Sequence, residues 1–270
     1  MNKRFLKAFY EQFKDDEVPA LGAQITYYLI LAFFPFLIFV ITLISYTPLA
    51  SNELLSYLAR LLPTDTYTLV LEILAEVSAS RSGTLLSIGV LATLWAASNA
   101  VMSLIRGLNK AYDQRESRAV WKLRAISLIF MVGLIIAILF SLGLLIFGKM
   151  LGSFLFNLLG HNELFATVWN LVRYLIPLAI LMLVFAFLYV YSPNQRVRFR
   201  EVWLGSLLAT LGWIIISTAF SYYVNNFGTY SKTYGSLGGI IVLLIWLYWS
   251  SIIILIGGEV NAARRNENKA

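Results

Sequence analysis

The feature that most constrains this chain is a set of six long runs that contain no Asp, Glu, Lys, Arg or His. A helix needs about 20 consecutive apolar residues to cross the hydrocarbon core of a bilayer, and each run is close to that length. Helices of soluble proteins are usually shorter and are interrupted by charges. The runs are Gln24–Tyr46, Gly83–Ile105, Ala125–Gly148, Tyr174–Ser192, Val202–Val224 and Gly239–Gly258.

The composition places the whole chain in a membrane. Of its 270 residues, 59% are hydrophobic and only 13% are charged, which is too little charge to cover the surface of a water-soluble domain. Only helices and closed barrels can span a bilayer, and the six runs lack the alternation of barrel strands. The sequence therefore predicts an all-α, polytopic membrane protein with six transmembrane helices.

The distribution of Lys and Arg predicts the orientation. The two ends of the chain and the loops after the second and fourth spans hold 16 of the 21 Lys and Arg residues, and the opposite loops hold 5. Short, positively charged loops stay in the cytoplasm, so both termini are expected there. Because the basic residues are divided among four segments, we expect them to contact anionic lipids of the cytoplasmic face and not nucleic acid.

The segment before the first span predicts an interfacial helix. In residues 1–19, Phe5, Phe9 and Phe13 recur at intervals of four among basic residues. This pattern is typical of an amphipathic helix that lies in the plane of the membrane surface, where it anchors the bundle or senses the surface.

The remaining segments complete the predicted organisation. Between the first two spans, residues 51–82 have helical periodicity on both sides of Pro63, which predicts an external helical hairpin. Residues 20–262 are then the transmembrane domain, and residues 263–270 form a cytoplasmic tail.

Several residues of the first two spans are candidates for the interior of the bundle. Pro35 removes a backbone donor in the middle of its span, so the helix is expected to kink or break there, either for packing or to frame a substrate site. Asn99 and Ser103 share one helical face with Arg106. An amide in hydrocarbon needs a polar partner, and Gln24 at the inner end of the first span is a candidate for Asn99.

The fifth span carries a stripe of polar and aromatic residues at intervals of three and four, which is one face of a helix. In lipid such a face turns inward, where its hydroxyl groups either bond to a neighbouring helix or line a pathway. The stripe consists of Ser206, Thr210, Trp213, Ser217 and Ser221.

The stretch "LIGGEVNAARR" places one carboxylate, Glu259, at the expected cytoplasmic end of the sixth span. A helix C-terminus disfavours an anion, so a cation is expected to compensate this acid. Glu259 is then either half of a structural ion pair, with Arg106 as the first candidate partner, or a protonatable site. The expected cluster at this inner boundary comprises Arg106, Arg124, Glu259 and Asn261, with Arg264 and Arg265 as further candidate partners.

Three stretches agree in order and spacing with a known family. They are "PALGAQITYYLILAFFPFLIF", "LWAASNAVMSLIRGLNKAYDQRESR" and "NNFGTYSKTYGSLGGIIVLLIWLYWSSIIILIGGEVNA". Together with the six-span layout, they resemble the YihY/BrkB family of bacterial inner-membrane proteins, from about Pro19 to Ala262. The resemblance implies a protein of the bacterial cytoplasmic (inner) membrane. It also implies links to envelope integrity, serum resistance and lipid export, with no defined substrate.

Members of that family were long labelled ribonuclease BN, but the residues of this chain argue against an enzyme. A metal-dependent nuclease needs clustered His and Asp ligands. This chain has one histidine, His161, and no cysteine. A metal-free nuclease needs a paired acid and base, and His161 and Glu163 lie on the wrong side of the membrane for cytoplasmic RNA. We therefore expect no catalytic residue, no cofactor and no metal, and the oligomeric state stays open.

Two classes of function remain. The favoured one is a transporter or flippase-like protein for a small or lipidic substrate, with a pathway between the first, second, fifth and sixth spans. The alternative is a non-transporting membrane scaffold for envelope assembly. Transport predicts a cavity lined by the polar stripe of the fifth span, whereas a scaffold predicts a tightly packed bundle with a large external contact surface.

Overall fold

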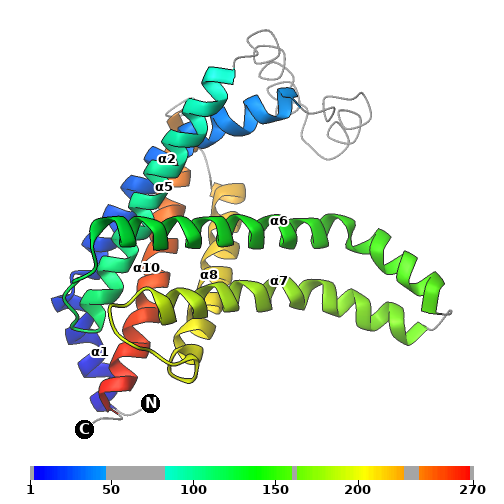
Figure 1. Ribbon diagram of the computed structural model, residues 1–270. Coiled ribbons are helices and arrows are strands. Elements are labelled where there is room, and N and C mark those ends of the chain that lie inside the picture. Colours follow the sequence, from blue (N-terminus) through cyan, green and yellow to red (C-terminus); the bar gives the residue numbers. More distant parts are fainter. Residues whose placement is uncertain (1–2, 47–82, 160–162, 228–236, 268–270) are drawn as a thin grey trace. The chain divides into compact units, whose positions relative to one another are not determined.

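The computed structural model describes residues 3–46, 83–159, 163–227 and 237–267. These residues form seven helices, and no strand occurs among them, which confirms the predicted all-α class for this part of the chain. The helices are α1 (Lys3–Asp15), α2 (Val18–Tyr46), α5 (Gly83–Ala111), α6 (Val120–Leu159), α7 (Glu163–Tyr191), α8 (Phe199–Phe227) and α10 (Leu237–Glu267) (Figure 1).

Six of these helices are long and apolar enough to cross a membrane, in agreement with the six predicted spans. Each of the six is longer than the uncharged run that predicted it. The reason is that an uncharged run reports the thickness of hydrocarbon, whereas a helix can continue into the polar interface with charged residues. Thus α7 begins at Glu163, ahead of the predicted Tyr174, and Pro177 lies well inside it.

The N-terminal helix α1 occurs where the sequence predicted it. It ends at Asp15, and Glu17 then adopts the left-handed backbone conformation with φ of 52°, so that α2 starts at Val18 after a tight turn. Further along, α2 continues as a helix through Pro35 and does not break there. The predicted external hairpin of residues 51–82 lies outside the described residues, as does His161.

The chain divides into two compact units. The larger comprises Met1–Thr26 and Ala100–Ala270, and the smaller comprises Tyr27–Asn99. The larger unit therefore contains α1, α6, α7, α8 and α10 with the adjoining ends of α2 and α5.

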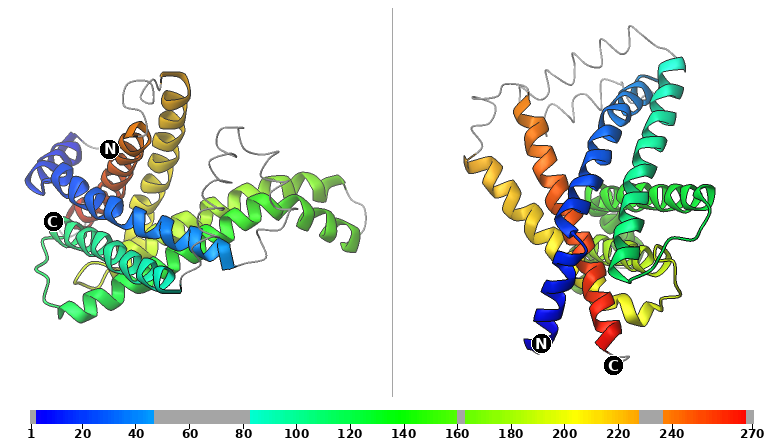
Figure 2. Two further views of the ribbon diagram at one scale, coloured as in Figure 1. Left: turned by 90° about the horizontal axis from the view of Figure 1, so that it is seen from above. Right: turned by 90° about the vertical axis from the view of Figure 1, so that its left-hand side faces the viewer.

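Within the larger unit, the most extensive contact between helices is that of α8 with α10. α8 packs along α10, α7 packs on α8, and α6 lies antiparallel beside α7 (Figures 1 and 2). α1 lies beside the C-terminal part of α10, which places the first and last helices of the chain side by side (Figure 2).

Glycines allow the closest approach between α8 and α10. A Cβ atom on Gly257 would lie 2.7 Å from the carbonyl oxygen of Gly205, so the two backbones are in direct contact. Tyr189 of α7 is fully buried beside them and donates a hydrogen bond of 2.7 Å to the carbonyl of Ile254. The core of the larger unit therefore sits where α7, α8 and α10 meet.

Candidate functional site

Glu259 of α10 is among the most deeply buried side chains of the described residues, with 1% of its surface exposed. Its Oε2 atom has no hydrogen-bond partner within the part of the chain that the structure describes. The helix continues for about two further turns to Glu267, so the negative end of the helix dipole lies beyond this acid. Burial, and not the helix end, therefore sets the cost of a charge at this position.

Asp16 faces Glu259 from the short connection between α1 and α2, and it is 8% exposed. The two carboxyl groups lie within hydrogen-bonding reach of each other, and the side chain of Gln12 reaches the Glu259 carboxyl from α1. Gln12 also donates a hydrogen bond of 2.7 Å to the carbonyl of Ala111, which ties α1 to α5. Burial raises the pKa of the Asp16 carboxyl, and the charge of Lys110 opposes that shift.

The arginines that were expected to neutralise Glu259 are placed differently. Arg106, the first candidate, is exposed on α5. Arg265 turns toward α8, where its Nε atom lies 3.5 Å from Oε2 of Glu201. The partners of Glu259 are thus a second acid and an amide. The remaining candidates are Arg264, which lies over the ring of Trp203, and Arg124, which is half-buried near the start of α6.

Two more buried polar side chains lie near this acid. Asn261 is 1% exposed and its Oδ1 atom accepts a hydrogen bond of 2.8 Å from the backbone N–H of Gly205. Tyr112 is 6% exposed, and its hydroxyl has no hydrogen-bond partner among the described residues. Burial raises the pKa of Tyr112, and the charges of Arg265, Glu201 and Glu259 also act on it.

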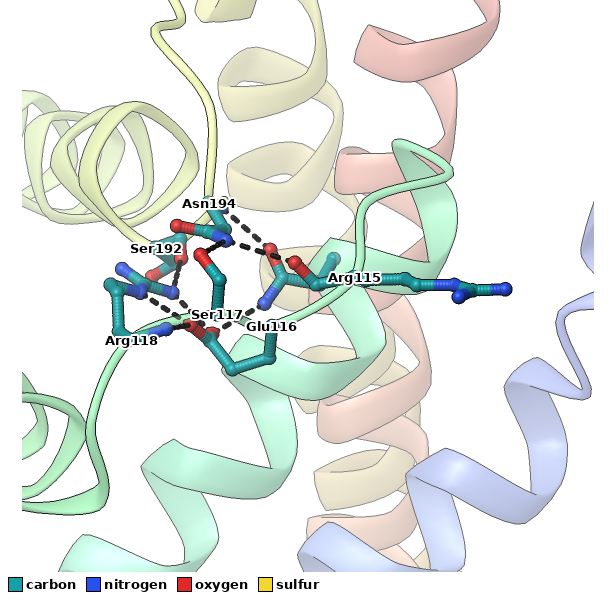
Figure 3. Close-up of polar contacts among 7 residues, drawn as sticks. Arg115, Glu116, Ser117, Arg118, Ser192 and Asn194 are labelled. Atoms are coloured by element: carbon teal, nitrogen blue, oxygen red, sulfur yellow. Dashed lines mark hydrogen bonds and ion pairs between the residues drawn. The ribbon is translucent and has the colours of Figure 1, made fainter.

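A second cluster joins the connection between α5 and α6 to the connection between α7 and α8 (Figure 3). Glu116 accepts two hydrogen bonds from the Arg118 guanidinium, at 2.8 Å from Nε and 2.7 Å from Nη2. The same Nη2 atom donates a bond of 2.7 Å to the carbonyl of Ser192 at the end of α7. We call this cluster the polar clasp, and it consists of Asn109, Arg115, Glu116, Ser117, Arg118, Ser192 and Asn194.

Asn109 is the centre of the polar clasp and is 3% exposed. Its Nδ2 atom donates to Glu116 at 2.7 Å, and its Oδ1 atom accepts from the backbone N–H of Asn194 at 2.6 Å. The hydrogen bonds and charge of Arg118 hold the pKa of Glu116 below its ordinary value, although burial acts in the opposite direction. These charge-assisted bonds make the clasp a rigid connection between two loops that are distant in sequence.

The polar stripe of α8 begins with two buried hydroxyls. Ser206 is 0% and Thr210 is 4% exposed, and each hydroxyl donates a bond of 2.8 Å to a carbonyl one turn earlier in the same helix. Ser217 accepts a hydrogen bond of 3.2 Å from the indole of Trp246, whose ring centroid lies 5.9 Å from that of Trp213. Trp213 and Ser217 therefore join α8 to α10.

The other residues predicted for the interior are spread over both units. Gln24 and Asn99 belong to different units, so their expected pairing stays a prediction. Ser103 is 1% exposed, and its hydroxyl has no hydrogen-bond partner within the described ranges. Pro35 and Asn99 are half-buried in the smaller unit, and Gln24 is half-buried on α2. Ser221 is exposed on α8.

Two adjoining apolar cavities follow α6 and α7, and none of the residues predicted for the pathway lines the larger one. The larger one, which we call the α6–α7 groove, has a volume of about 630 Å³. A second cavity of about 250 Å³ shares Leu134, Ile180 and Val184 with it and reaches Trp213 of α8. The groove is lined by Ile126, Ile129, Phe130, Gly133, Leu134, Ile180, Leu183, Val184, Phe187 and Tyr191.

Sequence reasoning missed Asp16 and the polar clasp. Asp16 belongs to "DDEVP" at the end of the predicted interfacial segment, and its only signal was its place among three consecutive acids next to the first span. The clasp residues were visible as polar side chains next to two spans. Their pairing across residues such as Asn109 and Asn194 had no local signal, because it depends on which loops meet in space.

Comparison with known proteins adds three findings. The family model described as Virulence factor BrkB matches residues 9–270. YfkH of Bacillus subtilis, whose name describes it as ribonuclease-like, is 40% identical over 265 residues, covering 98% of this chain and 96% of YfkH. A UPF0761 membrane protein of Tolumonas auensis is 28% identical over 266 residues, covering 97% of this chain and 85% of that protein. No solved structure matches.

Proposed function

Because the chain belongs to the BrkB virulence factor family and is a membrane protein, we propose that it moves a lipidic substrate across the bacterial inner membrane, as a transporter or flippase. Both termini are cytoplasmic in this proposal. The excess of Lys and Arg in the terminal segments supports that orientation, as does the contact between α1 and the C-terminal part of α10.

The α6–α7 groove carries the proposal. Ligand sites commonly have volumes of about 300–1,000 Å³, and the groove falls in that range at about 630 Å³. Its lining is almost wholly apolar, and Ile129 and Leu183 expose 72% and 53% of their surfaces. An open apolar groove on helices of a membrane protein suits an acyl chain, which enters from the side through the bilayer.

Basic residues at one end of the groove suit an anionic headgroup. Phe199 packs edge-on against the groove residue Phe187, with 5.3 Å between ring centroids, and it stands between Arg198 and Arg200. On α6, the exposed Lys122 precedes the groove residue Ile126 by four positions, which places both on one helical face. The favoured substrate class is therefore a lipid with an anionic headgroup.

Gly133 offers a clean test of the groove. A Cβ atom on Gly133 meets no atom within 4 Å, so a side chain can begin there without a clash, and Gly133→Phe is expected to occupy the groove. The matched control is Gly239→Phe on α10, where a Cβ atom also meets nothing within 4 Å and which lies outside the groove.

The assay is flipping of a fluorescent phosphatidylglycerol in proteoliposomes, followed by chemical quenching of the outer leaflet. Gly133→Phe is expected to lower the protein-dependent rate at least about tenfold, equivalent to about 1.4 kcal/mol, while Gly239→Phe leaves it unchanged. A parent protein with no flipping activity, or equal rates in the two variants, would contradict the proposal.

The tight packing of α8 on α10 favours a second candidate, the envelope scaffold. Direct contact between Gly205 and Gly257 leaves no passage between these two helices at that level. A scaffold of this kind holds lipid in the groove without moving it. Retained binding of the fluorescent lipid without flipping by the parent protein would favour this candidate. In both cases the proposed role is not enzymatic.

A further inference from the structure

We propose that Asp16 and Glu259 together form a proton-binding site whose occupancy holds α1 against α10. The two acids come from elements far apart in the chain, are 8% and 1% exposed, and lie within hydrogen-bonding reach of each other. A hydrogen bond between two carboxyl groups requires a proton on one of them. The ligand of the site is that shared proton.

The surroundings of the pair contain an unused polar group. Tyr112 is 94% buried and lies close enough to Glu259 for the two to interact electrostatically, and its buried hydroxyl has no hydrogen-bond partner among the described residues. Buried hydroxyls are normally satisfied, so an unpartnered one beside an acid pair marks a place where a proton or a hydrogen bond can be accepted.

A metal ion fits the site less well than a proton. No group of three or more His, Cys, Asp or Glu side chains suited to a metal occurs among the described residues. Calcium takes six to eight oxygen ligands, which two carboxyl groups and one amide do not supply.

The charged groups around the pair leave it without a full counter-charge. On the α1 side the pair meets the neutral amide of Gln12 and the carboxyl group of Asp15, and on the other side it meets Lys110 of α5 and Asp113 just after α5. The charge of Lys110 acts on Asp16, but its Nζ atom also forms an ion pair of 3.4 Å with Glu17, so Lys110 does not neutralise Asp16 alone. Across Tyr112, the α8 and α10 side chains Glu201 and Arg265 pair with each other.

The consequence is a pH-dependent contact between α1 and α10. When the pair holds a proton, Asp16 bonds to Glu259 and α1 stays docked through Gln12. When the proton leaves to water, two carboxylates face each other in a buried site and repel. The docked arrangement binds more protons than the released one, so rising pH favours release.

The chain has no cysteine, so two spin labels can be placed without background. Tyr10→Cys on α1 and Asn266→Cys on α10 put both labels on exposed positions. Pulsed electron–electron double resonance then measures the distance between the two labels in nanodiscs at about pH 5 and at about pH 9. One short, narrow distribution is expected at the lower pH, and a longer, broader one at the higher pH.

Asp16→Asn is expected to keep the short distance at both pH values, because the neutral amide removes the repulsion. Asp15→Asn is the matched control: this neighbouring acid is exposed, so its variant should keep the change in distance with pH, with the midpoint at a lower pH because the charge of Asp15 raises the pKa of Asp16. Glu259→Gln serves as a second neutral variant if Asp16→Asn fails to fold. The measurement requires no transported lipid, so it is independent of the proposed flipping.

Three results would overturn the proton site. They are a distance distribution in the parent that does not change with pH, a pH response that survives both neutral variants, and a response to Na⁺ or K⁺ at constant pH. The last result would assign the pair to a metal cation instead.

Discussion

Replacing Asn109 with alanine is expected to loosen the polar clasp by an amount that the structure allows us to estimate. The change removes a hydrogen bond of 2.7 Å to the Glu116 carboxylate and one of 2.6 Å from the backbone N–H of Asn194. A bond to a charged group contributes about 1.5–3 kcal/mol and a neutral one about 0.5–1.5 kcal/mol. Asn109→Ala should therefore lower the free energy of unfolding by about 2–4 kcal/mol.

Thermal unfolding of the purified protein in detergent, followed by tryptophan fluorescence, measures this loss. For a chain of this size it corresponds to a fall in Tm of about 4–16 °C. Asn226→Ala is the control, because Asn226 is exposed and makes one hydrogen bond to a carbonyl of its own helix; its effect should stay within about 0.5 kcal/mol.

The pH dependence provides an internal check on the same variant. The pKa of Glu116 is below its ordinary value of 4.5, so this carboxylate stabilises the fold fully above that value and loses its contribution as pH falls through the folded pKa. Without Asn109, one of the bonds that lower this pKa is gone, so the loss of stability in acid, which begins near the unfolded value of 4.5, should be smaller and should be complete at a higher pH. A Tm for Asn109→Ala equal to that of Asn226→Ala, with an unchanged acid profile, would refute the reasoning.

Two further predictions concern packing and topology. Gly257→Ala should destabilise the protein by about 1–3 kcal/mol, because its Cβ atom would lie 2.7 Å from the Gly205 carbonyl oxygen. Gly133→Ala should stabilise the protein by about 0.5–1 kcal/mol, because its Cβ atom meets nothing within 4 Å and alanine favours the helix over glycine. Thermal shifts of the same sign for both variants would be inconsistent with the packing described. A phosphatase or fluorescent-protein reporter fused after Ala270 should report a cytoplasmic location, and an external location would reverse the proposed orientation.

The importance of Glu259 could be predicted from the sequence, but its partner could not. Glu259 is the one acid directly after a long uncharged run, and from this pattern the sequence predicted either an ion pair or a protonatable site near the inner boundary. Its partner was predicted among the arginines, since opposite charges usually compensate a carboxylate. In the structure Arg106 is exposed and Asp16 occupies the facing position, because α1 folds back beside α10.

The sequence by itself determined the all-α class, the six spans and the amphipathic helix before them. These properties are local: the thickness of the hydrocarbon sets the length of each uncharged run, and the periodicity of a helix sets the spacing of its apolar face. The tertiary structure alone decided that Asp16 meets Glu259, that Asn109 meets Asn194, and that an apolar groove opens between α6 and α7. Each of these depends on which helix surfaces pack together, and in lipid many apolar surfaces are nearly equivalent, so small residues and a few buried polar contacts make that choice.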